Sequence, residues 1–418
     1  MVMFLIPPER LNHLLGRFRN VLSKPQFENF RSVMFGLIMS GCKEHDVKSM
    51  RDTVGETKCQ SSINRFFTSP SWNLDDVMKC AQEIIFSTVR HDDNLEFLII
   101  DDTVCKKYGM QSEMVCYNHS TILGTVLSHD YVTGLYLCGD ICLPSSARLY
   151  GNPKKCNDKG IPFRTKIELC NEIIGQHRPI ARKTVTLIDS WYTGNEVISN
   201  CRKRGYGWIG DLKPNRVIIY DDKRMNVSNL LNILRKRGQF TDTVIDGQIY
   251  QTVKVMAYIP SLRENVSIVI NAKADTKDVH VLSTDLQEDV STILRYARKR
   301  VMIENSYKDA KQLGFGEYRF RKSEAALIHA HLVFLAYILI QILRYRLLSY
   351  RITKAVPSME FVITWVRKKT TQGFIHYIWD KLKQGISIRS LTMTVGKIDT
   401  VYIRKCKHSA KSYWLCGL

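Results

Sequence analysis

Two stretches decide the fold: residues 95–103 read LEFLIIDDT, and residues 183–192 read KTVTLIDSWY. In each, an apolar run of strand length ends at an aspartate, Asp101 in the first and Asp189 in the second. Apolar runs of this length predict strands that are buried on both faces. The two carboxylates therefore follow buried strands, and the strand ends of an α/β sheet are where ligands commonly bind.

The segments around these strands predict a mixed α/β sheet. Strand-like runs at 121–128 and 131–143 follow the first strand, and we expect the turn between them around Asp130 and Gly134. Further along, helical patterns at 163–177 and 193–204 alternate with strand patterns at 183–189 and 207–212. Three meandering strands followed by alternating helix and strand exclude a sandwich or a helical bundle.

Composition and periodicity divide the chain into five segments. A helical N-terminal domain is expected first, because amphipathic stretches recur there and Asn73 is placed to cap the last of them. A β-rich insertion interrupts the sheet, with a hairpin turn at Asp246-Gly247. The last segment is a basic module that holds 13 Lys and Arg against 3 Asp and Glu. The predicted segments are 1–88 (helical domain), 89–212 (sheet core, first part), 213–280 (β-rich insertion), 281–350 (core, second part) and 351–418 (basic module).

The charge balance predicts a polyanionic partner. The chain has 418 residues, and 61 Lys and Arg against 40 Asp and Glu leave a formal charge of +21. For a soluble protein this favours nucleic acid. The 12 cysteines are scattered without a CxxC pair, which favours reduced thiols inside the cell over a zinc site. The apolar segment from Ala325 to Leu343 is too interrupted for a membrane span and predicts a buried helix. We expect an intracellular, DNA-associated protein without a membrane partner, in the cytoplasm or nucleoid if its host is prokaryotic.

A third acid, Glu304, lies in a basic segment from Tyr296 to Lys311 that predicts one long helix. Basic and aromatic residues stand four before it and three, four and seven after it, so they share its helical face. One carboxylate among cations suits a metal ligand beside a phosphate backbone. The residues of this helix that we expect to contact DNA are Arg300, Lys311, Tyr307, Lys308 and Lys299.

Asp101, Asp189 and Glu304 together predict a metal-dependent phosphodiester site. Carboxylates from two neighbouring strands, faced by one from a helix, can hold two divalent ions and activate water or a 3′-hydroxyl. Oxygen ligands favour Mg²⁺ or Mn²⁺. Each acid alone could also be a cap or part of a surface salt bridge, and only their conjunction favours catalysis. Asp102 is the alternative to Asp101 as the first ligand.

In these residues the chain resembles the DDE transposases of cut-and-paste insertion sequences. Their first acid stands in an Asp-x-Ser/Thr setting, as at 101–103, and a small residue and an aromatic often follow their second, as at 189–192. Their third acid stands in the pattern Tyr-x2-Arg-x3-Glu-x6-Lys. Here Arg300, Glu304 and Lys311 keep the spacing, and Tyr296 lies one residue too early. The long interval between the second and third acids fits a branch of the family that inserts a β domain there.

The resemblance implies an RNase H-like core, flanked by helices, interrupted by the β insertion and preceded by a helical domain that binds transposon ends. It implies that Asp101, Asp189 and Glu304 bind the metal ions and that Arg300 and Lys311 contact end DNA. The enzyme would cut double-stranded DNA at transposon ends and join the 3′-hydroxyl to target DNA, as a homodimer or larger assembly. A DNA-binding protein without catalytic activity and a nuclease without strand transfer are the alternatives. In some relatives an aromatic residue stacks on a flipped base, and the candidates here are Trp191, Trp208 and Tyr250.

Three other patterns favour structural explanations or stay open. Residues 205–210 match GxGxxG, but they enter a strand and no helix follows, unlike a dinucleotide site. His329 and His331 open an apolar helix on which their rings diverge, so a core role is favoured over metal binding. Residues 61–67 combine polar, basic and aromatic side chains, which suit either a DNA contact or a helical bundle.

Overall fold

The structure, a computed structural model, describes residues 5, 7–40, 45–54, 59–120, 124–273, 279–388 and 390–391. The chain divides into two compact units. One comprises residues 1–88 and 309–418 and is helical where it is described, and the other, residues 89–308, contains the sheet. The three acids of the predicted site, Asp101, Asp189 and Glu304, all belong to the sheet unit.

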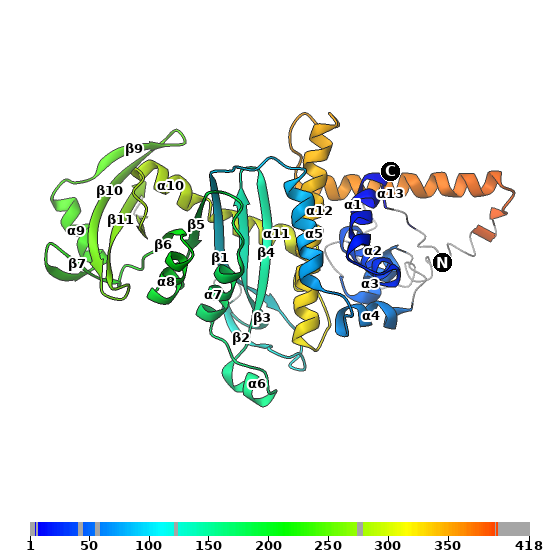
Figure 1. The fold of residues 1–418 in the computed structure, drawn as a ribbon, viewed down its shortest axis with the longest axis horizontal. Coiled ribbons are helices and arrows are strands. Elements are labelled where there is room, and N and C mark those ends of the chain that lie inside the picture. Colours follow the sequence, from blue (N-terminus) through cyan, green and yellow to red (C-terminus); the bar gives the residue numbers. More distant parts are fainter. Residues whose placement is uncertain are drawn as a thin grey trace, which may run out of the picture. The chain divides into compact units, whose positions relative to one another are not determined.

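A single sheet runs through the second unit (Figure 1). Among the described residues twelve strands take part, in the order β2-β3-β1-β5-β6-β12-β11-β10-β7-β8, with β4 paired to β3 and β9 to β10. The strands are β1 (Leu95–Lys106), β2 (Cys116–Ser120), β3 (Gly124–Cys138), β4 (Ile141–Tyr150), β5 (Lys183–Ile188), β6 (Gly207–Asp211), β7 (Val217–Tyr220), β8 (Lys223–Asn226), β9 (Thr241–Ile245), β10 (Gln248–Ile259), β11 (Glu264–Lys273) and β12 (Val279–Thr284). The helices of this unit are α6 (Pro153–Asp158), α7 (Lys166–Gln176), α8 (Asn195–Lys203), α9 (Val227–Lys236), α10 (Val290–Arg298) and the greater part of α11 (Val301–Gln312).

The core of this sheet is RNase H-like, as predicted. Strands β1, β3 and β4 form an antiparallel meander, and β5 and β6 then run parallel to β1. Helices α7 and α8 connect the later strands and pack on one face, where Leu169, Ile173 and Val197 bury against Ile100 and Val132. Parallel strands require such helical crossovers, which explains the change from meander to alternation along the chain.

The first hairpin differs from the prediction. Strand β3 continues through Asp130 and Gly134, and the turn lies later, at Gly139 (φ +58°) and Asp140. Gly134 sits at a register shift between β3 and β4, where an added Cβ would lie 2.9 Å from Cγ2 of Ile173. The glycine therefore permits close packing under α7 and does not mark a turn. Residues 121–123 of the predicted strand lie outside the described residues.

Strand β1 is also longer than predicted. It continues past Asp101 to Lys106 because its antiparallel pairing with β3 extends from Phe97 to Lys106. Its parallel pairing with β5, by contrast, ends at Ile100 opposite Ile188. Asp101 thus lies at the end of the parallel pair but in the middle of the strand.

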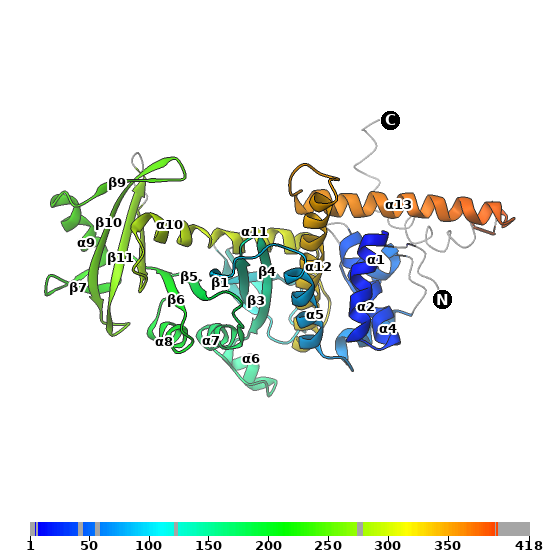
Figure 2. The ribbon, with the colours of Figure 1, turned by 45° about the horizontal axis from the view of Figure 1, so that its top comes forward.

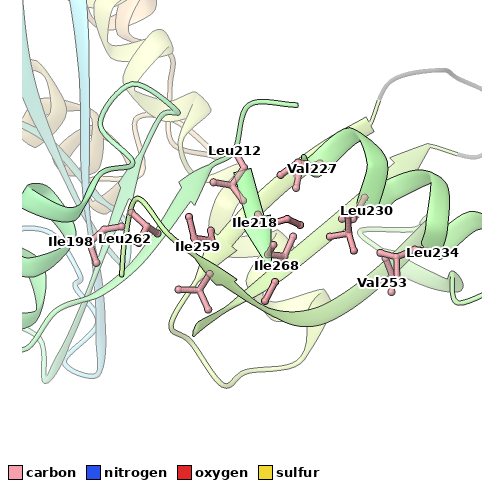
Figure 3. Packing of buried hydrophobic residues seen from close by; sticks show 14 of the residues in the cluster. Ile198, Leu212, Ile218, Val227, Leu230, Leu234, Val253, Ile259, Leu262 and Ile268 are labelled. Atoms are coloured by element: carbon pink, nitrogen blue, oxygen red, sulfur yellow. The ribbon is translucent and has the colours of Figure 1, made fainter. Parts of the chain in front are cut away.

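The strands β7 to β12 and helix α9 follow β6, in the place of the expected insertion. Strand β12 pairs with β6, so these strands extend the same sheet. The turn at Asp246 (φ +52°) and Gly247 (φ +79°) joins β9 to β10, as predicted for a tight hairpin. Figure 3 shows side chains of α9, β7, β10 and β11 packed toward one another, with Val227, Leu230 and Leu234 contributed by the helix. This helix was not predicted.

The helical unit is built around α12. This helix is long and apolar enough to cross a membrane, but 94% of its most apolar window is buried in the protein, so it is the core helix that was predicted. Within α4, Phe66 and Phe67 are buried, and Phe66 stacks on Trp72 at 4.7 Å, which favours the bundle explanation for residues 61–67. Asn73 caps α5 by accepting hydrogen bonds from two backbone amides, as predicted. The helices are α1 (Glu9–Gly16), the 3₁₀ helix η1 (Arg17–Asn20), α2 (Lys24–Met39), α3 (Val47–Val54), α4 (Gln60–Thr68), α5 (Leu74–Phe86), α12 (Ser323–Ser349) and α13 (Met359–Lys383).

The described residues cover only part of two predicted features, the scattered reduced cysteines and the basic module. Nine cysteines lie in the described part of the chain, all as free thiols, and seven of them are buried. In the basic module, α13 buries Val362, Val366 and Thr370 in its first half. Residues 392–418 of that module lie outside the described residues.

Candidate active site

Strand register brings Asp101 and Asp189 together. The last pairs of the parallel ladders are Ile100 with Ile188 and Ile188 with Gly210. The residue after each of these pairs is an aspartate: Asp101 within β1, Asp189 directly after β5 and Asp211 at the end of β6. The three carboxylates therefore lie side by side on three neighbouring strands, one residue beyond the last aligned pairs. Asp211 was not predicted as a site residue, although it lies next to the last residue of the predicted strand 207–212.

The alternation of β1 separates Asp101 from Asp102. Successive side chains of a strand point to opposite faces of the sheet. The Asp101 carboxylate meets Arg300, whose Nη1 lies 3.3 Å from Oδ2. Asp102 instead accepts a hydrogen bond from Nζ of Lys166, at the start of α7, at 2.7 Å. The two candidates for the first ligand thus lie on opposite faces of the sheet, Asp101 toward Arg300 and Asp102 toward the start of α7.

Burial dominates the electrostatics of the two aspartates. The pKa of Asp101 is raised to about 7, chiefly by burial and also by the charges of Asp189 and Asp102, against the opposite effects of the Asp102 backbone amide and the Arg300 guanidinium. Burial also raises the pKa of Asp189, against hydrogen bonds from the amides of Tyr192 and Trp191. Two half-buried carboxylates, of which the charge on Asp189 opposes the ionisation of Asp101, form a site that favours a cation.

Arg300 bridges two of the three strand-end carboxylates. Its Nη2 lies 3.5 Å from Oδ2 of Asp211, while its Nη1 contacts Asp101. Asp211 also lies 3.0 Å from Nε2 of His280, on β12. The guanidinium of Arg300, which was predicted to contact DNA, therefore meets two carboxylates in this structure.

Glu304 lies in the first turn of α11 and is exposed. The predicted single helix from Tyr296 to Lys311 is wrong, because α10 ends at Arg298 and α11 begins at Val301 (Figure 2). Around the break the amides of Lys299 and Arg300 bond to carbonyls three residues back, which tightens the ladder into a 3₁₀ turn. Arg300 and Glu304 consequently do not share one continuous helical face.

Tyr307 docks α11 on the sheet beside Asp101. Its hydroxyl lies 2.6 Å from Oγ1 of Thr133, and Thr133 pairs with Asp101 in the β1–β3 ladder. Burial raises the pKa of Tyr307 well above its ordinary range. This tyrosine was predicted to contact DNA, but its hydroxyl is turned into the protein. Glu304 precedes it by one turn.

The remaining predicted DNA contacts are exposed. Lys299 lies at the break between the helices, and Lys308 and Lys311 lie on α11, the latter in its last turn. Of the aromatic candidates for base stacking, Trp208 is fully buried and belongs to the core. Trp191 is 61% exposed, two residues after Asp189, with Nζ of Lys213 at 5.6 Å from its ring centre. Tyr250 is half-buried under the guanidinium of Arg298.

The carboxylate oxygens of Asp101 and Asp189 fit a hard divalent cation. Over the described ranges, however, no group of three or more His, Cys, Asp or Glu side chains is arranged to hold a metal ion. The sequence-predicted trio is therefore brought together only in part, with Glu304 apart from the two aspartates.

The sheet is RNase H-like, and it carries neighbouring carboxylates on β1 and directly after β5, as the resemblance to a family of nucleases implied. The sequence matches the family described as "Transposase DDE domain" over residues 165–339, and the family described as "DDE superfamily endonuclease" over residues 17–233. The second match spans more than half of the chain, so this chain belongs to the DDE superfamily of endonucleases, as a DDE-type transposase. A comparison with curated proteins finds no match.

Proposed function

We propose that the protein is a DNA transposase that cleaves at transposon ends and transfers the 3′-hydroxyl into target DNA. The observation that carries the proposal is the β1–β5 register, in which Asp101 and Asp189 follow the last paired residues of two neighbouring parallel strands. Arg300 against Asp101 adds a cation at the same point. The superfamily match supports nuclease chemistry on DNA.

In this proposal Asp101 and Asp189, completed by Glu304, hold Mg²⁺ or Mn²⁺. Two such ions would activate the attacking water or hydroxyl and stabilise the leaving oxygen. The chain's own contribution is to fix both aspartates in a partly dry site, where charge interactions are stronger than in water. Arg300 is suited to a phosphate beside them, since a guanidinium binds phosphate as it binds carboxylate.

The DNA surface in the proposal extends from Arg300 to the exposed lysines at positions 299, 308 and 311. We assign Tyr307 to the docking of α11 and not to DNA. Residues 1–88 are proposed to bind the transposon ends, and residues 351–418 to add a basic module. A homodimer or larger assembly on paired ends, acting inside the cell, follows from the family resemblance.

One observation favours a second candidate, a DNA-binding protein without catalysis. Glu304 is exposed, and the described residues hold no three-ligand cluster. A nuclease that cuts without joining is a third candidate, since the matched family is described by its endonuclease activity. All three bind DNA, so they are separated only by their chemistry.

Glu304→Gln tests the proposal, because it removes the charge and keeps the shape. The assay uses full-length protein, a plasmid carrying the DNA that flanks the coding sequence, and Mg²⁺ or Mn²⁺. We expect the native protein to nick and join, and Glu304→Gln to bind DNA equally while cutting is abolished. Glu196→Gln is the matched control, because Glu196 is also exposed in the first turn of a helix, α8.

Each outcome selects one candidate. Cutting and joining by the native protein supports the transposase, and cutting without joining supports the nuclease. Binding without nicking in either metal refutes both and leaves the binding protein. Undiminished cutting by Glu304→Gln would show that the third ligand is assigned wrongly.

A further inference from the structure

The carboxylate of Asp189 is held by the turn that follows it. Its Oδ1 accepts hydrogen bonds from the amides of Trp191 at 2.9 Å and Tyr192 at 3.1 Å. Its backbone carbonyl accepts from Oγ1 of Thr193 at 2.7 Å. The orientation of this aspartate therefore depends on where the segment 191–193 lies.

The carboxylate of Asp101 is held in a similar way by its neighbour. Its Oδ1 accepts a hydrogen bond from the amide of Asp102 at 2.9 Å. The side chain of Asp102 lies on the opposite face of the sheet, where it meets Lys166 of α7. Whatever fixes Asp102 therefore also fixes the amide that holds Asp101.

A tyrosine joins these two arrangements. The hydroxyl of Tyr192 donates a hydrogen bond to Oδ1 of Asp102 at 3.2 Å, and the Tyr192 side chain is fully buried. A continuous chain of bonds thus runs from the Asp101 carboxylate through Asp102 and Tyr192 to the Asp189 carboxylate. This series of hydrogen bonds begins and ends at Asp101 and Asp189, the two acids that the β1–β5 register makes neighbours.

A lysine anchors the middle of the chain of bonds. Nζ of Lys166 lies 2.7 Å from Oδ2 of Asp102 and 2.7 Å from Oδ2 of Asp130, whose side chain is 3% exposed. Lys166 is the first residue of α7, and a capping box between Thr165 and Glu168 fixes that end of the helix. The position of Asp102 is thereby set by α7 and β3 as well as by its own strand.

We propose that Tyr192, Asp102 and Lys166 are positioning residues that set the relative placement of the Asp101 and Asp189 carboxylates, and with it the affinity of the site for a divalent cation. The inference rests on the proposed function, because it takes both aspartates as metal ligands. Partners behind a metal ligand typically change metal affinity or activity by 10–100-fold when they are removed.

Tyr192→Phe is the test, since it deletes one hydroxyl and keeps the ring in the core. Tyr206→Phe is the matched control: Tyr206 is buried in the same cluster, but its hydroxyl bonds to the backbone carbonyl of His177. Binding of Mn²⁺ to each full-length protein is titrated by electron paramagnetic resonance, without DNA. The Mg²⁺ concentration that gives half-maximal cleavage is measured separately.

We expect Tyr192→Phe to weaken Mn²⁺ binding by about tenfold or more and to raise the half-saturating Mg²⁺ concentration in parallel. DNA binding in the presence of a chelator should not change. Tyr206→Phe should bind Mn²⁺ like the native protein, even where both variants lose similar stability. If Tyr192→Phe does not fold, Lys166→Met tests the same hydrogen bonds and should also weaken Mn²⁺ binding. Lys166→Arg should restore part of the Mn²⁺ affinity that Lys166→Met loses.

Native-like Mn²⁺ affinity in folded Tyr192→Phe or Lys166→Met overturns the inference and leaves the proposed function intact. Equal losses in Tyr192→Phe and Tyr206→Phe also overturn it, because the effect would then be one of core stability. A native protein that binds no Mn²⁺ refutes the proposed function itself, and the inference with it.

Discussion

Replacing Glu96 by glutamine should destabilise the sheet that carries the site. Glu96 lies on β1, five residues before Asp101, and its side chain is fully buried. Both carboxylate oxygens accept hydrogen bonds, which come from β1's neighbours and from the segment before β5. The donors are His177 Nε2 at 2.8 Å, Thr184 Oγ1 at 2.8 Å, Tyr136 OH at 2.9 Å, and the amides of Ile180 and Ala181 at 2.9 Å each.

The pKa of Glu96 sets the magnitude of this effect. Burial alone would raise the pKa, but the bonds from His177, the two amides and Thr184 outweigh burial and lower it from its ordinary 4.5 to about 2. At 1.36 kcal/mol for each pKa unit, the charged form stabilises the fold by roughly 3 kcal/mol. Glutamine loses this charge and turns an NH₂ group toward donors, so the loss at pH 7 should be at least that large.

The sign of the pH dependence follows from the lowered pKa. The stabilisation is fully present above pH 4.5, the pKa of the unfolded chain, and is lost as the pH falls toward 2. The difference between native and Glu96→Gln should therefore be about 2 kcal/mol smaller near pH 3 than at pH 7. If native protein and Glu96→Gln are equally stable at pH 7, or differ equally at both pH values, the charge on Glu96 does not stabilise the fold in this way.

Native-state hydrogen exchange of the β1 and β5 amides is the assay, because it reports the opening of this sheet in a chain with two units. A loss of about 3 kcal/mol corresponds to exchange that is on the order of a hundredfold faster. Glu172→Gln is the control. Glu172 accepts from Arg148 and Arg164 but is partly exposed, so its replacement should change stability by less than about 1 kcal/mol.

Three further predictions concern the site and DNA. Gly210→Ala should slow cleavage at least tenfold, because its Cβ would lie 2.3 Å from Oγ1 of Thr193, which holds the turn after Asp189; native kcat would contradict this. Arg300→Ala should move the pH profile of cleavage to higher pH, because Arg300 lowers the pKa of Asp101; an unmoved profile would exclude the contact from the working enzyme. Removal of residues 371–418 spares the buried part of α13 and deletes 8 Lys and Arg against 2 Asp and Glu. It should weaken DNA binding and flatten the salt dependence of that binding. An unchanged slope in a salt titration would show that this segment does not contact DNA.

Much of the fold could be predicted because the relevant signals are local. The apolar runs before Asp101 and Asp189, the Asp246-Gly247 turn and the Asn73 cap each depend on a few adjacent residues. The position of the first hairpin could not be predicted, because Gly134 serves the packing of Ile173, a residue distant in the sequence. Local patterns carry no information about such a contact.

The site was predictable to the same extent. Asp101, Asp189 and Arg300 could be chosen from spacing, and the structure brings Asp101 close to both of the others. The break before Glu304 was missed because basic and polar residues continue the helical pattern across Arg298 to Val301, while the backbone bonds there tighten. Asp211 was missed because its meaning comes only from the alignment of β6 with β5.

The sequence by itself determined the change from meandering strands to alternating helix and strand, the acids that follow the apolar runs and the excess of positive charge, because these follow from residue type and periodicity. Tertiary structure decided which acids meet. The register of β1 on β5, with Ile100 opposite Ile188, makes Asp101 and Asp189 neighbours. The pleat of β1 turns Asp102 to the opposite face, toward Lys166 and Tyr192. A shift of one residue would exchange these roles, because side chains alternate between the faces of a strand.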